Sequence, residues 1–306
     1  PWLLAVAGAV YGLGFYTYIA YRATPLLVVL LLRRTGWKRA AVFTAAAAVV
    51  AAPLAVYFAG HPGTFLGRTA QLSVWRAYST PQAAAEAARN TWRTARMLFT
   101  HGDYNWRQNL PWRAELFWPV AVFLVLGLVA KRKQKWVPLT WLAVAALPAI
   151  LSAQDVPHAQ RSILMLPPAM LLAALGAQAA YEFLAQRAPR RMVAATAALL
   201  LALLAWEPYH TYFDVWARNP AIPQFFDVAA AGLAWQINRL PREEDKYVVT
   251  PPGADMLPQP VMFLTGSYTR RQQAAVHIHY LADPDCGHAR GLLPGAPVFC
   301  LAPAGR

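Results

Sequence analysis

Residues 116–151 read LFWPVAVFLVLGLVA (116–130), KRKQK (131–135) and WVPLTWLAVAALPAIL (136–151). Two runs without a charged side chain thus enclose a compact basic cluster. A helix needs roughly 17–25 apolar residues to cross a bilayer, and both runs come close to that length. Lysine and arginine concentrate in the cytoplasmic loops of membrane proteins. The stretch therefore predicts two membrane-crossing helices joined by a cytoplasmic turn.

The same pattern recurs along the first 206 residues. Further apolar runs, with Glu182 as their one charged side chain, are Ala40–Phe58, Ser162–Phe183 and Val193–Trp206. At the start we expect one span over 2–20 and a short or tilted return over 25–32. The basic clusters are Arg33, Arg34, Lys38 and Arg39; Lys131, Arg132, Lys133 and Lys135; and Arg187, Arg190 and Arg191. Two apolar runs separate each cluster from the next, so all three clusters fall on the cytoplasmic side.

This parity predicts an all-α polytopic membrane bundle of about 6–7 transmembrane helices over residues 1–206. Two loops, 59–114 and 152–161, then lie outside. The last span delivers residues 207–306 to the external face, where we expect a small α/β domain.

Composition supports a membrane location. The chain has 306 residues, of which 58% are hydrophobic and 14% charged, whereas soluble domains carry about 25% charged residues. From Glu207 onward, eight basic residues face nine acidic ones, so the formal net charge of +14 belongs to the membrane-embedded part. The expected partner is therefore the lipid bilayer and not nucleic acid.

The C-terminal hundred residues predict one amphipathic helix, 221–240, and short buried strands at 246–250, 275–279 and 298–301. His277 and His279 alternate along a strand, but no acid or cysteine lies at ligand spacing in the sequence, so no metal site is predicted. No cofactor is required, and nothing indicates a divalent cation. Cys286 and Cys300 leave two alternatives open, a disulfide or two buried thiols.

The long external loop contains seven arginines and no lysine. Thr80 followed by Pro81 predicts a helix start, and the helix should run to Phe99. Arg89, Arg93 and Arg96 are spaced to share one face of it. Guanidinium groups grip phosphate bidentately, so this face either holds the phosphate of a lipid-linked substrate or binds anionic headgroups without selectivity.

Two polar segments lie at the mouths of apolar runs. The first, 101–111, holds Asp103, Asn105, Arg107 and Asn109 beside tryptophans, a composition typical of a sugar site; internal pairing and turn formation are the alternative. The second, 154–161, places His158 and Arg161 at a helix N-terminus, which favours anions. This pair predicts a phosphate contact, with an interfacial anchor as the alternative.

Several short motifs occur in a characteristic order. They are Gly12-Leu-Gly-Phe-Tyr16-Thr-Tyr18 with Arg22; His61-Pro62 with Phe65 and Arg68; Gly102-Asp103 with Asn105, Arg107, Asn109 and Pro111; and Pro157-His158-Ala159 with Arg161. Up to about Asp227, the chain resembles the C-terminal part of bacterial multi-spanning glycosyltransferases of the GT-C superfamily. These are relatives of protein O-mannosyltransferases and of the aminoarabinose transferases that modify lipid A. Gln108 departs from the pattern, which has a histidine there.

The resemblance implies an enzyme that transfers a sugar from a polyprenyl-phosphate donor to a lipid, protein or glycan acceptor. Transfer takes place at the external face of the bacterial plasma (inner) membrane. The family's catalytic carboxylate follows its first transmembrane helix, a part that we expect this chain to lack, so the catalytic residue is unknown. The expected substrate-binding residues are Tyr18, Arg22, Arg89, Arg93, Arg96, Asp103, Asn105, Arg107, Asn109, His158 and Arg161.

Two alternatives stay open. A ligase or polymerase of surface polysaccharide also needs outer-face arginines, for a pyrophosphate-linked donor. A transporter or flippase of lipid-linked glycans needs a polar path across the bilayer, and the apolar runs lack the intramembrane charges typical of ion-coupled transporters.

Overall fold

The computed structural model describes residues 2–33, 35–253 and 258–301, without the side chains of Leu66 and Arg68. Arg34 of the first basic cluster thus lies outside the described residues. The chain forms two compact units, Pro1–Asp214 and Val215–Arg306. The boundary expected from the sequence was 206/207; the helix there continues through Pro208 to Tyr209, followed by a π-helical segment, His210–Trp216.

The first unit is helical. Its α-helices are α1 (Trp2–Leu13), α2 (Thr24–Leu32), α3 (Trp37–Gly60), α4 (Pro62–Leu72), α5 (Val74–Ala77), α6 (Thr80–Phe99), α7 (Trp118–Val129), α8 (Trp136–Ile150), α9 (Leu166–Ala185) and α10 (Arg190–Tyr209). Short 3₁₀ segments are η1 (Gly14–Tyr16), η2 (Ile19–Ala23), η3 (Lys133–Lys135) and η4 (Gln160–Met165). The chain turns through η1 and η2, so α1 ends at Leu13, short of the span expected over 2–20.

Among the described residues, three helical segments are long and apolar enough to cross a membrane: Trp37–Gly60, Gln160–Ala185 and Arg190–Trp216. This is fewer than the 6–7 spans expected. Helix α7 begins at Trp118, with Pro119 in its first turn, and ends at Val129. Its 12 residues rise about 18 Å against a hydrocarbon thickness of ~30 Å. Apolar composition was correctly predicted, but helix length was not.

The surfaces of α3 and α10 fit lipid better than water. Only 6% of the most apolar window of either helix is buried within the protein. Trp37, Val49 and Leu199 are each more than two-thirds exposed. Continuous apolar surface of this kind marks an interaction with a partner or a membrane, so the first unit has the character of a membrane protein.

Glycines allow two helix pairs to pack closely. A Cβ on Gly127 of α7 would collide with the Leu172 carbonyl oxygen of α9, and a Cβ on Gly176 of α9 would collide with the Phe123 carbonyl oxygen of α7. Gly8 and Gly12 of α1 also lie close to the backbone of α3, since a Cβ on either would meet the carbonyl oxygen of Phe43 or Ala47 within 3 Å. Small residues let helix backbones approach in this way in membranes, where hydrophobic burial does not drive helices together.

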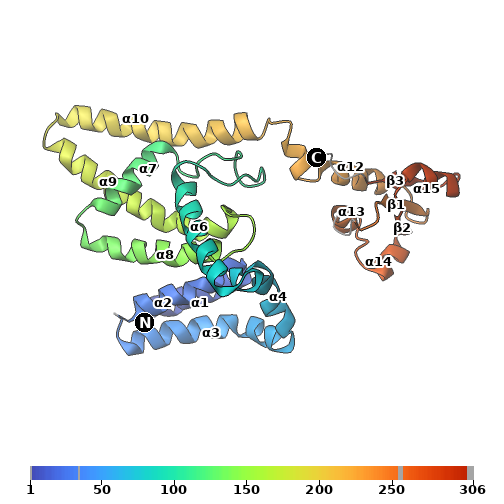
Figure 1. Cartoon of the computed structure of the whole chain (residues 1–306), viewed down its shortest axis with the longest axis horizontal. Coiled ribbons are helices and arrows are strands. Elements are labelled where there is room, and N and C mark those ends of the chain that lie inside the picture. The colour runs from blue at the N-terminus through green and yellow to red at the C-terminus, as the bar shows by residue number, and fades with distance from the viewer. Residues whose placement is uncertain (1, 34, 254–257, 302–306) are drawn as a thin grey trace. The chain divides into compact units, whose positions relative to one another are not determined.

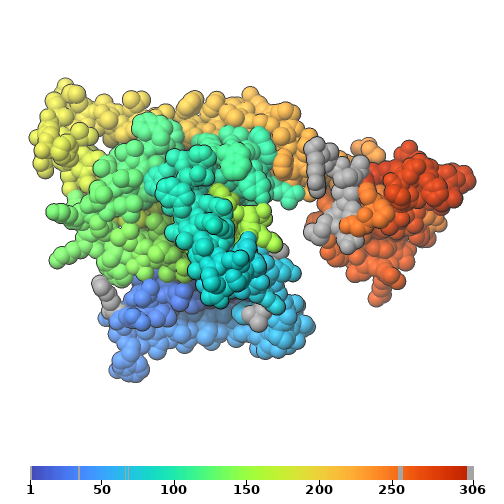
Figure 2. Space-filling view, in the orientation of Figure 1, coloured from blue at the N-terminus to red at the C-terminus, as the bar shows by residue number. Residues whose placement is uncertain are grey.

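Helix α6 lies against α8, as Figure 1 shows, and its outer side faces the viewer in Figure 2. The predicted helix over 80–99 is confirmed, but its N-cap is Ser79 and not Thr80. The Ser79 amide and hydroxyl both donate to Gln82 Oε1, at 3.3 and 2.8 Å. This reciprocal cap fixes where the arginine-bearing helix begins.

The second unit contains a parallel three-stranded sheet in the order β2-β1-β3, formed by β1 (Lys246–Thr250), β2 (Ile278–Ala282) and β3 (Val298–Cys300). Its helices are α11 (Ile222–Phe225), α12 (Val228–Ile237), α13 (Gln259–Leu264), α14 (Arg270–Ala275) and α15 (Cys286–Leu292). Its core is formed by Ala230, Ala234, Ile237, Val248, Val261, Ile278 and Leu301.

Two elements of the second unit differ from the sequence-based prediction. The single helix expected over 221–240 is broken at Asp227, whose φ of 52° is left-handed. The strand expected at 275–279 begins only at Ile278, because α14 extends to Ala275 and His277 is itself left-handed. A disulfide joins Cys286 of α15 to Cys300 of β3, which decides between the two alternatives for these cysteines.

The α7–α9 contact generates a first prediction. Gly127→Ala should lower the melting temperature in detergent, because the new methyl group forces backbones apart, and overpacking typically costs about 1–3 kcal/mol. Gly67→Ala in α4 is the control, since nothing lies within 4 Å of its Cβ position. That change should stabilise by roughly 0.5–1 kcal/mol through helix propensity. Equal effects of the two substitutions would disprove the close contact.

The disulfide generates a second prediction. Its partners are 14 residues apart, and closing a loop of that size contributes about 3 kcal/mol. The double substitution Cys286→Ser and Cys300→Ser should therefore lower the unfolding midpoint of the second unit. Limited proteolysis of the full chain at increasing temperature measures this midpoint. In the wild type, maleimide should label neither cysteine before reduction; immediate labelling of both would contradict the pairing.

Candidate functional site

A buried aspartate joins the two polar loops that the sequence singled out. Asp103 is 1% exposed. Its Oδ1 accepts a hydrogen bond from the Asn105 amide at 2.8 Å, and its Oδ2 accepts one from the Ala159 amide at 2.9 Å. A buried carboxylate is stable only with such partners. Asp103 therefore fixes segment 101–113 against segment 155–161.

Asn105 and Asn109 order the first of these loops. Asn105 Oδ1 accepts from the Arg107 amide at 3.0 Å. Asn109 Oδ1 accepts from the Leu110 amide, and its Nδ2 donates to the Arg113 carbonyl at 3.1 Å. These contacts support the loop-ordering role that the sequence left open beside sugar binding.

Arg161 is also buried, at 6% exposure. One guanidinium nitrogen, Nη1, donates to Ser152 Oγ at 2.6 Å and to the Gln154 carbonyl. The other, Nη2, lies 4.0 Å from the Asp155 carboxylate, which is beyond hydrogen-bond distance. Half of the guanidinium fork is thus held by the protein, and Nη2 can still bind a ligand.

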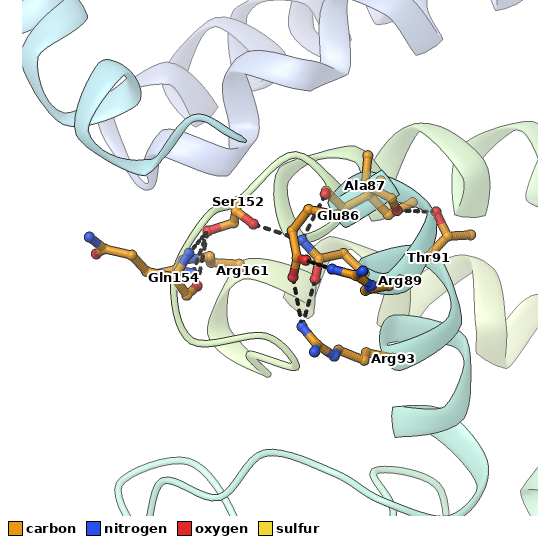
Figure 3. A network of polar contacts seen from close by, with 10 residues as sticks. Glu86, Ala87, Arg89, Thr91, Arg93, Ser152, Gln154 and Arg161 are labelled. Atoms are coloured by element: carbon orange, nitrogen blue, oxygen red, sulfur yellow. Dashed lines mark hydrogen bonds and ion pairs between the residues drawn. The ribbon is translucent and has the colours of Figure 1, made fainter. Parts of the chain in front are cut away.

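The basic face of α6 connects to Arg161 through a polar network (Figure 3). Arg89 and Arg93 both pair with Glu86 at 2.9 Å. Arg93 also donates to Asn90 Oδ1, and the buried Asn90 amide donates to the Ser152 carbonyl at 2.8 Å. Glu86 thus offsets part of the positive charge of this face.

Arg96 differs from the other two arginines of this face. Its Nε is buried without a hydrogen-bond partner among the described residues. Of the three arginines predicted to share one face, Arg89 and Arg93 therefore share the Glu86 carboxylate, whereas Arg96 has an unsatisfied donor.

Three predicted residues line one pocket. Tyr18, Arg22 and Arg161 surround a cavity of about 330 Å³, whose other walls are mostly apolar and include Leu26, Trp75 and Leu147. Arg22 donates to the Phe65 carbonyl at 2.6 Å, and its guanidinium carbon lies 4.3 Å from the centre of the Phe65 ring. Segments more than a hundred residues apart thus place two guanidinium groups on one apolar pocket.

Arg107 lines a different cavity, of about 590 Å³, together with Glu115. Sequence reasoning missed Glu115, although it is an isolated acid at the start of an apolar run. Burial, the main cause, raises the pKa of its carboxyl group. Asn90 and Ser152 were also missed, because only the fold brings them to the arginines.

His158 lies beside Asp103, with 3.9 Å between its Nδ1 and Asp103 Oδ2. This Nδ1 is buried and has no hydrogen-bond partner among the described residues. Burial, followed by the charge of Arg161, lowers the pKa of His158, while Asp103 and Asp155 oppose the shift. The imidazole is therefore neutral near pH 7, so a phosphate would meet a hydrogen-bonding group here and not a cation.

The second unit brings an acid to its two histidines. Asp245 Oδ1 lies 3.1 Å from His277 Nδ1 and 2.9 Å from His279 Nε2, a contact that the spacing in the sequence did not indicate. These hydrogen bonds, first that of His279, lower the pKa of Asp245. Within the described residues no group of three or more His, Cys, Asp or Glu is arranged to hold a metal ion.

Comparison with known protein families, with curated proteins and with solved structures finds no match to this chain. The class of protein that the structure itself defines is a mostly helical protein of membrane character that carries a small parallel sheet.

The state of His158 generates a third prediction. Its pKa is lower in the folded chain than in the unfolded one, so the unfolded state binds more protons on acidification, and stability falls as the pH drops through about 6.5. His158→Gln should remove this part of the loss. The measurement is the melting temperature at pH 7.5 and at pH 5.5. Between these two values the melting temperature of the variant should fall less than that of the wild type. A steeper decline in the variant would mean that His158 is charged in the fold.

Proposed function

We propose that this chain is the phosphate-binding part of a membrane glycosyltransferase of the GT-C type. It would take a sugar from a polyprenyl-phosphate donor and transfer it to a lipid, protein or glycan acceptor. The observation that carries the proposal is the pocket of about 330 Å³ where Arg22 and Arg161 meet an otherwise apolar wall. A lipid phosphate combines the two properties that such a pocket recognises, an anionic head and an apolar chain.

The chemistry assigned to the pocket is electrostatic. Negative charge builds on the leaving phosphate as the sugar departs, and fixed guanidinium groups in a water-poor site stabilise it. Arg161 suits this role because Ser152 and Gln154 already fix its orientation. A general base that deprotonates the acceptor would come from a segment outside this chain. Asp103 is not proposed as that base, because both of its carboxylate oxygens accept hydrogen bonds from backbone amides.

We further propose a bacterial plasma membrane location with the site and the second unit on the external face. The disulfide between Cys286 and Cys300 supports an oxidising compartment for the second unit. The shorter apolar helices, such as α7, would complete the bundle of 6–7 spans beside the three long ones, packed through contacts like that of Gly127.

The polysaccharide ligase or polymerase stays the main rival, because a diphosphate-linked donor presents the same anionic head. Binding of polyprenyl monophosphate and diphosphate to the same pocket distinguishes the two: a clear preference for the diphosphate would favour the rival. Water-accessible helix faces from one side of the bilayer to the other would favour a transporter.

The pocket generates a fourth prediction. Arg161→Gln and Arg22→Gln, each in the chain reconstituted in nanodiscs, should weaken binding of undecaprenyl phosphate about 10- to 100-fold. A hydrogen bond to a charged group contributes roughly 1.5–3 kcal/mol, and 1.4 kcal/mol is tenfold. Arg39→Gln in α3 is the matched control and should leave affinity unchanged.

Binding of undecaprenol, which lacks the phosphate, separates recognition from structural damage. A misfolded pocket would lose both lipids, whereas loss of the phosphate contact affects only the phosphorylated one. If neither substitution changes phosphate binding, the pocket does not hold the donor.

A further inference from the structure

The larger cavity, of about 590 Å³, lies on the other side of the segment that carries Arg161. Gln160 and Ser162 line it, while Arg161 between them lines the smaller pocket. A single turn of η4 thus separates two cavities. The volume of the larger cavity is within the range of roughly 300–1,000 Å³ that small-molecule sites occupy.

This cavity has a polar end and an apolar body. The polar end is formed by Arg107, Gln108, Glu115, Gln160 and Ser162. The apolar body is formed by Met97, Leu98, Leu116, Ile163, Met165, Leu166 and Ala169. One carboxyl and one guanidinium group give the polar end no net charge, so an uncharged head fits it better than an ionic one.

Two side chains in this cavity indicate a polar ligand. Ser162 is 5% exposed, and its hydroxyl is buried without a hydrogen-bond partner among the described residues. Such an orphaned group costs free energy unless something binds it. Glu115 Oε1 accepts a hydrogen bond from the Asp103 amide at 3.2 Å, so the protein fixes this carboxyl group at the cavity.

We propose that this cavity is a second lipid site, for an amphiphile with an uncharged, hydroxylated head and a single apolar chain. Hydroxyl groups both donate and accept hydrogen bonds, so one head can donate to Glu115 and accept from Ser162. The chain lies along the Met and Leu side chains. This site does not depend on donor binding in the smaller pocket.

The test uses the full chain in nanodiscs and a monoacylglycerol that carries a photoactivatable diazirine in a sixteen-carbon chain. Labelling should map to peptides that contain 97–98 and 163–169. Unlabelled monopalmitoylglycerol should compete, whereas palmitate, with an anionic head, and hexadecane, with no head, should compete at least about tenfold less well.

Ile163→Trp is the blocking variant, because Ile163 lines the cavity yet is 56% exposed, so that the larger ring fills the site without disturbing the core. Labelling should fall at least about tenfold. Leu171→Trp is the matched control: Leu171 is 48% exposed on the same helical segment, and labelling should not change. Leu166→Trp gives a second blocking variant if the first melts early.

Glu115→Gln keeps an oxygen for the Asp103 amide but removes the strong acceptor, so competition by monopalmitoylglycerol should weaken about 2- to 10-fold, the value of one hydrogen bond. Undecaprenyl phosphate, the ligand proposed for the smaller pocket, should not compete for labelling, which separates the two sites. The proposal is overturned if the wild type shows no mapped labelling, if both blocking variants label like the control, or if palmitate competes equally well.

Discussion

The buried carboxylate of Asp103 is the contact on which the candidate site depends. It is 1% exposed and accepts hydrogen bonds from backbone amides of two loops that are more than fifty residues apart in the sequence. A polar group taken out of water is stable only with such hydrogen bonds, and these bonds fix the two loops against each other. The position of Arg161, two residues beyond Ala159, follows from this attachment, and so does the separation of the two cavities.

The arginines of α6 and Arg161 have different contacts. Arg89 and Arg93 share Glu86, and Arg93 also donates to Asn90. The Asn90 amide donates to the Ser152 carbonyl oxygen, and the Ser152 hydroxyl accepts a hydrogen bond from Arg161. The basic face of α6 is therefore connected to the pocket by hydrogen bonds. Exposed ion pairs contribute little to stability, whereas the buried Asn90 bond fixes α6 to the loop that carries Arg161.

Lipid contact and internal packing make different demands on the first unit. Helices α3 and α10 expose most of their apolar surface, while α7 and α9 approach through Gly127 and Gly176. Short apolar helices are compatible with a bilayer only if it thins or if neighbours cover their ends. The close α7–α9 pair provides such a neighbour, because α9 belongs to a segment long enough to cross.

The sequence by itself determined the apolar helices, the helix over 80–99 and the alignment of Arg89, Arg93 and Arg96, since each follows from spacing within a few turns. It also predicted the strands at 246–250 and 298–301 to within a residue. Only the tertiary structure decided that α7 stops at 12 residues, that Asp245 meets His277 and His279, and that Glu115 is buried beside Arg107 in a cavity. The reason is physical: local patterns fix which face of a segment is apolar or charged, whereas the partner of that face comes from parts of the chain that no local pattern connects.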